Sequence, residues 1–135
     1  MSSQSRRLVL DSSAVLAAAQ EEAGAENVRL WLAAPPPDGM FIHAVNACEV
    51  ASKLIALGFP APAAFRLARP APARLVSALN LSTWRRAAVL RGTCPQLSLG
   101  DRICISFAET LGADILTGDR LFREANSPAG IRLFR

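Results

Sequence analysis

The sequence has few of the residues from which disulfide and zinc frameworks are built. Only three of its 135 residues are cysteine, namely Cys48, Cys94 and Cys104, an odd number with no C-x-x-C spacing. Disulfide-stapled domains and zinc sites need paired or closely spaced thiols, so neither is expected to hold this fold together. We expect the three cysteines to be small residues of the core.

Histidine and lysine are equally scarce, because His43 and Lys53 are the only ones. A serine or cysteine hydrolase needs a positioned base, and His43 lies in an apolar run that predicts a hydrogen-bonded core histidine. A response-regulator receiver domain needs a lysine late in the chain, which is missing. An aspartate-nucleophile phosphatase would need a second aspartate where Ser13 stands.

Long apolar runs are absent as well. None approaches the roughly 20 residues that a membrane-spanning helix needs, and no apolar segment of a secretory signal precedes Leu8. Polar low-complexity tracts are also missing, while hydrophobic residues make up 51% of the chain, so the composition does not indicate disorder. The length suits one compact domain over residues 1–135, and we expect that domain in the cytoplasm.

The charge is moderately basic. The formal net charge is +4, and Lys53 is the only one of the 15 basic residues that is not arginine. Arginine's planar fork matches phosphate oxygens, so the bias is compatible with a nucleic-acid partner. A GC-rich genome would produce the same bias, so the charge alone does not decide between the two explanations.

Strand-like and helix-like segments alternate along the chain. Short apolar runs predict five strands, at residues 7–10, 41–45, 74–79, 113–117 and 131–134. Helical periodicity, with Trp31 and Trp84 as expected core residues, predicts helices at 13–20, 25–33, 46–57, 63–69, 82–91, 98–111 and 120–124. Such alternation requires crossover connections, so we predict a three-layer α/β/α fold with a central, mostly parallel five-stranded sheet.

Acidic residues mark the junctions between these segments. Four of the 11 acidic residues lie where a strand gives way to a helix or in a helix's first turn: Asp11, Glu49, Asp101 and Asp119. Each has an adequate structural explanation by itself, since Asn46 with Glu49 and Ser98 with Asp101 have capping-box spacing and Asp11 suits an N-cap. An N-cap adds about 1 kcal/mol to the stability of its helix, which is reason enough for an acid at any one of these positions.

Helix capping explains the four acids less well when they are taken together. A parallel sheet brings several of these junctions to one edge, and two carboxylates about 4 Å apart repel by roughly 4 kcal/mol at an effective dielectric of 20. A cation among them would relieve this repulsion. Oxygen ligands without clustered histidine or thiolate favour Mg²⁺ or Mn²⁺.

The four acids stand in motifs that resemble those of a known family. The segments are Leu-Asp11-Ser-Ser13-Ala, Ala-Val-Asn46-Ala-Cys-Glu49-Val, Leu-Ser98-Leu-Gly-Asp101-Arg102 and Leu-Thr117-Gly-Asp119-Arg120. In order and spacing they resemble the acidic motifs of the PIN domain, in particular of the VapC-like toxins of bacterial toxin–antitoxin pairs. This resemblance implies a PIN-like doubly wound sheet, a homodimer, cleavage of RNA with Mg²⁺ or Mn²⁺, and an antitoxin that blocks the groove.

The resemblance also implies residue roles. Asp11, Glu49, Asp101 and Asp119 become the metal-binding and catalytic set. Ser13, Asn46 and Thr117 would support them by hydrogen bonds, and Arg102 and Arg120 would hold phosphate. The segment 60–72, unusually rich in alanine and proline, departs from the family's pattern where substrate and partner surfaces are shaped. A non-catalytic module that binds RNA or protein on the same fold is the alternative.

Overall fold

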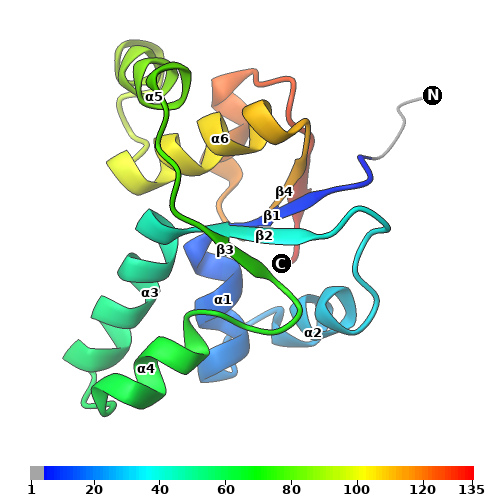
Figure 1. Ribbon diagram of the computed structural model, residues 1–135, viewed down its shortest axis with the longest axis vertical. Helices are drawn as coiled ribbons and strands as arrows, with labels where there is room; N and C mark the ends of the chain where they lie inside the picture. Colours follow the sequence, from blue (N-terminus) through cyan, green and yellow to red (C-terminus); the bar gives the residue numbers. More distant parts are fainter. Residues whose placement is uncertain (1–4) are drawn as a thin grey trace.

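The computed structural model describes residues 5–135, in which strands and helices alternate (Figure 1). The strands are β1 (Leu8–Leu10), β2 (Met40–His43), β3 (Arg74–Val76), β4 (Asp114–Thr117) and β5 (Ile131–Leu133). The helices are α1 (Ser12–Gln20), α2 (Ala25–Ala33), α3 (Ala44–Ala56), α4 (Ala61–Leu67), α5 (Leu81–Thr93), α6 (Leu99–Leu111) and the 3-10 helix η1 (Arg120–Ala125). The predicted order of elements is confirmed.

All five strands are parallel, in the order β3-β2-β1-β4-β5. The chain builds outward from β1 through β2 to β3, and then crosses back to place β4 on the other side of β1. The connections therefore diverge between β1 and β4, and this reversal is the point where open α/β sheets form a crevice beyond the strands' carboxyl ends.

Side chains alternate along each strand and so build one core on each face of the sheet. Leu8 and Leu10 of β1 pack with α1, α2, α3 and α4 on one face, whereas Val9 packs with α5, α6 and η1 on the other. Figure 1 shows these two groups of helices on opposite sides of the strands. The fold is thus the predicted three-layer arrangement, with a sheet that is parallel throughout.

The junction between β2 and α3 differs from the prediction, because β2 ends at His43 and α3 begins at Ala44. The His43 imidazole caps the helix: Nδ1 accepts a hydrogen bond from the Val45 N–H at 3.1 Å, and Nε2 donates to the Ala78 carbonyl at 2.9 Å. His43 is therefore the buried, hydrogen-bonded residue that was expected. The capping-box spacing of Asn46 and Glu49 does not mark a cap, since Asn46 lies inside the helix.

Two further expectations about burial are wrong. Cys48 is exposed, although Cys94 and Cys104 are buried as expected. Trp84 is 47% exposed, while Trp31 packs against the core. Cys48 lies on α3 and Trp84 on α5, and helical spacing alone does not fix which side of a helix is buried. Among residues 5–135, no helix has the length and apolarity needed to cross a membrane.

Candidate active site

Asp11 ends β1 and opens α1 as its N-cap, and its side chain is only 3% exposed. The carboxylate oxygen Oδ2 accepts hydrogen bonds from the hydroxyls of Ser13 at 2.7 Å and Thr117 at 2.8 Å. No described residue donates to the other oxygen, Oδ1. Burial raises the pKa of Asp11 to about 6, against the lowering effect of these two hydroxyls, and the nearby charge of Asp101 raises it further.

Glu49 reaches the same region from α3. Its Oε1 accepts hydrogen bonds from the Ser12 hydroxyl at 2.6 Å and from the Asn46 side-chain amide at 2.9 Å. The Asn46 amide also donates to the Gly100 carbonyl at 3.1 Å, which links α3 to α6. A Cβ atom at position 100 would collide with the Glu49 carboxylate, so a glycine there gives Glu49 its place.

Asp101 approaches from the opposite layer, in the first turn of α6. The predicted capping box is confirmed: the Asp101 carboxylate accepts from the Ser98 N–H at 3.0 Å, and the Ser98 hydroxyl accepts from the Asp101 N–H at 3.1 Å. Burial raises the pKa of Asp101, and the charges of Asp119 and Glu49 add to that rise. Asp101 therefore both caps α6 and lies close to two other acids.

Asp119 follows β4 and opens η1. Its Oδ1 accepts a hydrogen bond from the Leu121 N–H at 2.9 Å, and its own N–H donates to the Thr117 hydroxyl at 3.0 Å. Because that hydroxyl also donates to Asp11, Thr117 connects the ends of the adjacent strands β1 and β4.

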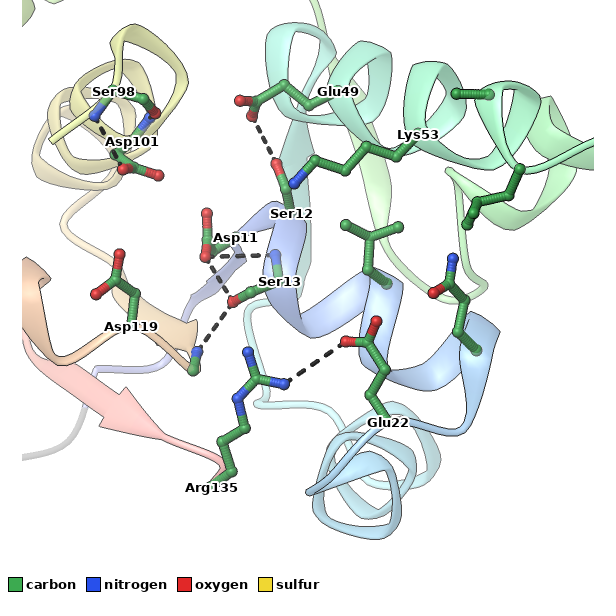
Figure 2. Close-up of a pocket in the computed structure, with 15 residues that line it drawn as sticks. Asp11, Ser12, Ser13, Glu22, Glu49, Lys53, Ser98, Asp101, Asp119 and Arg135 are labelled. Atoms are coloured by element: carbon green, nitrogen blue, oxygen red, sulfur yellow. Dashed lines mark hydrogen bonds and ion pairs between the residues drawn. The ribbon is translucent and has the colours of Figure 1, made fainter.

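These four acids line one pocket of about 920 Å³, at the upper end of the usual range for ligand sites. Figure 2 shows Asp11, Asp101 and Asp119 on neighbouring segments, with Glu49 reaching in from α3. Within residues 5–135, none of the four forms an ion pair, although five other acids do: Glu21, Glu22, Asp38, Glu109 and Asp114. The four acids found at strand–helix junctions therefore share one pocket.

The donor chemistry of the pocket suits a hard divalent cation, because carboxylate oxygens predominate and neither histidine nor cysteine lines it. The free Oδ1 of Asp11 agrees with a place for positive charge, and so do the raised pKa values of Asp11 and Asp101, which burial causes first and the neighbouring acids increase. As the side chains stand, however, no three acidic, histidine or cysteine side chains of residues 5–135 are grouped closely enough to hold one metal ion.

The supporting residues predicted from the sequence divide into two groups. Ser13, Asn46 and Thr117 all hydrogen-bond to the acids, as described above. Arg102 does not reach the pocket, because its guanidinium donates to the Ala87 carbonyl of α5 at 2.9 Å, and we remove it from the candidate site. Arg120 is exposed on η1, outside the residues that line the pocket.

Sequence reasoning missed several residues of the pocket. Ser12 binds Glu49, and Gly100 makes room for it. Lys53 and Arg135 are the two basic residues that line the pocket. Lys53 could have been found from its position one helical turn after Glu49, whereas no sequence signal points to Arg135.

Fold and pocket together define a doubly wound α/β protein with an acidic site at its topological switch point. The PIN domain family model matches residues 8–127, and the chain belongs to this family of nucleases. No curated protein matches the chain in sequence.

Solved structures of toxin–antitoxin proteins share this fold. VapBC2 from Rickettsia felis, bound to a promoter DNA fragment, matches with a TM-score of 0.70 and 11% identity over 94% of this chain and 98% of that one. VapBC-1 from nontypeable Haemophilus influenzae matches with a TM-score of 0.69 and 12% sequence identity, over 95% of this chain and 98% of that one. A toxin–antitoxin complex from Klebsiella pneumoniae matches with a TM-score of 0.64 and 16% sequence identity, over 95% of this chain and 98% of that one. At these identities the likeness is one of fold.

Proposed function

We propose that this chain is an endoribonuclease that depends on Mg²⁺ or Mn²⁺ and acts in the cytoplasm as the toxin of a toxin–antitoxin pair. One observation carries the proposal: four carboxylates from separate segments line a single pocket, and none has a cationic partner within residues 5–135. Four independent helix caps would not require such a shared pocket.

Asp11, Glu49, Asp101 and Asp119 would hold the metal. When bound, such a cation supplies hydroxide at neutral pH and neutralises charge that builds on the phosphate. In each of the four carboxylates one oxygen accepts the hydrogen bonds described above, and the other oxygen would be free to bind the metal, as Oδ1 of Asp11 is. Ser13 and Thr117 hold Asp11 from behind, so the free oxygen keeps its direction toward the pocket.

The proposed reaction is hydrolysis in which an in-line water attacks phosphorus. The bond from phosphorus to the 3′ oxygen breaks, the 3′ oxygen takes up a proton, and the products carry a 5′-phosphate and a 3′-hydroxyl. Glu49 and Asp101 lie on helices that cover opposite faces of the sheet, so they would approach the phosphate from two sides. Their supports on α3 and α6 limit how far each can move.

The proposal includes protein partners. One structural relative is described as a toxin–antitoxin complex and two others as VapBC proteins, so we propose a cognate antitoxin that blocks the pocket. We also propose a homodimer of this chain, as the resemblance to VapC-like toxins implies. A small neighbouring reading frame encoding a DNA-binding protein is the expected antitoxin. Expression of this chain alone should slow bacterial growth, and co-expression of that neighbour should restore it.

The decisive experiment measures cleavage of end-labelled RNA with Mn²⁺, with Mg²⁺ and with a chelator. Wild type should cleave only with metal and leave 5′-phosphate ends, and Asp11→Asn should lose at least a hundredfold in rate while remaining folded. Asp38→Asn is the matched control, because Asp38 pairs with Arg6 outside the pocket. Metal-independent cleavage, full activity of Asp11→Asn, or indifference to Mn²⁺ would contradict the proposal, and indifference would indicate a binding module.

A further inference from the structure

The pocket extends well beyond the four acids. It is lined by both ends of α1, from Ser12 to Gln20, and continues to Glu22. With a rise of 1.5 Å per residue, these two ends lie about 12 Å apart. Along one strand of a duplex, successive phosphates are displaced by about 3.4 Å in the direction of the helix axis. The pocket is therefore longer than a single phosphodiester, and its second half has room for a neighbouring nucleotide.

Arg135 enters this second half from the segment after β5. Its guanidinium lies over the Phe134 ring, 5.0 Å from the centroid, and passes so close to Gly118 that a Cβ there would lie 2.5 Å from Nε. Its ion partner is Glu22, at 3.6 Å, and no described residue accepts a hydrogen bond from it. The side chain is positioned by packing, yet all its N–H donors are unused within residues 5–135.

Lys53 enters from the opposite wall. It lies four residues after Glu49 on α3, so the two side chains share one face of the helix, one turn apart. Lys53 is exposed, lines the pocket, and forms no ion pair with Glu49 or with any other residue that the structure describes. In Figure 2 its side chain runs from α3 toward Ser12.

The charge balance of the pocket gives these two residues a role. Five acidic and two basic residues line it, so an incoming phosphate strand meets repulsion everywhere except beside the metal and beside Lys53 and Arg135. A strand bound through one phosphate alone would be free to pivot. A second cationic contact beside the acids would fix its direction.

We propose that Lys53 and Arg135 form a phosphate-binding subsite for a nucleotide adjacent to the cleaved bond. The inference rests on the proposed nuclease function and adds to it: the substrate must carry at least one charged phosphate beyond the scissile one. Glu22 holds the guanidinium in the free protein and releases it when the phosphate arrives.

A purely structural ion pair between Arg135 and Glu22 makes a different prediction. In that case Arg135→Gln and Glu22→Gln would lower stability equally and would leave RNA binding unchanged. As a subsite, Arg135→Gln weakens RNA binding, whereas Glu22→Gln leaves it equal or tighter, because the acid competes with phosphate for the guanidinium.

The test measures binding of a labelled oligoribonucleotide by fluorescence anisotropy at about 50 mM salt with Mn²⁺. All variants carry Asp11→Asn, so that binding is read without turnover. Lys53→Gln and Arg135→Gln should each raise Kd about fivefold, as expected for loss of a partly exposed ion pair, and reduce the salt slope by about 0.7. Arg135→Lys should restore part of the affinity. Arg91→Gln, an exposed arginine on α5 outside the pocket, is the matched control.

A scan with neutral methylphosphonate linkages locates the contacted phosphate. One neutral linkage beside the scissile bond should weaken binding to the parent protein but not to the Lys53→Gln/Arg135→Gln variant, since the two changes remove the same contact. Unchanged Kd in both single variants, or equal losses at Arg91, would overturn the subsite. Retained cleavage by Asp11→Asn would contradict the nuclease proposal instead, so the two failures are distinguishable.

Discussion

Replacing Asp11 by asparagine should stabilise the metal-free protein at neutral pH, although it removes a central residue of the site. The carboxylate is 3% exposed, and burial raises its pKa from 3.8 to about 6. A shift of that size corresponds to about 3 kcal/mol of differential stability. Asparagine keeps an oxygen to accept from Ser13 and Thr117 and carries no charge to bury.

The direction of the pH dependence follows from the raised pKa. Below pH 3.8 the carboxyl is protonated in both the folded and the unfolded chain, so burial carries no charge penalty. Between pH 3.8 and about 6 the unfolded chain loses the proton while the folded chain keeps it, and stability falls as pH rises. Above about pH 6 the full penalty applies. Asp11→Asn lacks this loss, so its advantage should grow over the same interval.

The assay is urea unfolding of wild type and Asp11→Asn in a chelator between pH 4 and 8. Allowing for weaker hydrogen bonds to an amide, we expect a gain of about 2 kcal/mol at pH 7.5, or roughly 6–10 °C in Tm, and less than about 1 kcal/mol at pH 4.5. Asp38→Asn serves as the control, because Asp38 is an exposed acid paired with Arg6. An Asp11→Asn protein that is less stable than wild type at pH 7.5, or a difference that does not vary with pH, would refute the reasoning.

Two further substitutions test the supports of the acids. Gly100→Ala should displace the Glu49 carboxylate, because the new Cβ would collide with it; we expect Mn²⁺ affinity in calorimetry to fall about tenfold with the fold retained, and unchanged affinity would contradict this role. Thr117→Val removes the hydroxyl shared by Asp11 and Asp119, so it should lower the free energy of unfolding by about 1–3 kcal/mol. It should also raise the upper limit of the pH interval of Asp11, which the folded-state pKa sets, and an unmoved limit would show that the hydroxyl does not hold that carboxylate.

Much of the fold could be predicted because its signals are local. Apolar runs and capping residues such as Ser98 depend on a few neighbouring positions, and they located nearly every strand and helix to within a few residues. The start of α3 was misplaced because its cap is His43, a residue whose side chain rarely serves this purpose compared with serine or asparagine. Exposure of Trp84 depends on how α5 is rotated against α6, which local spacing does not determine.

The candidate site was predictable only in part, for a similar reason. Asp11 and Asp119 gather because β1 and β4 are adjacent, which follows from sheet topology once the strands are known. The contribution of Gly100 depends on the distance between α3 and α6, and that of Arg135 on the path of the chain after β5. The same long-range packing turns Arg102 toward α5 rather than toward the acids.

The amide of Asn46 joins α3 on one face of the sheet to the start of α6 on the other. Glu49 and Asp101 therefore lie on helices that cover opposite faces of the sheet, and the separation of the two acids depends on how these helices are held together. A displacement of α3 against α6 would change that separation without unfolding either helix. Loss of the proposed activity on heating would then report a displacement of α3 against α6, and a ligand bound between these two helices would inhibit that activity without contacting the acids.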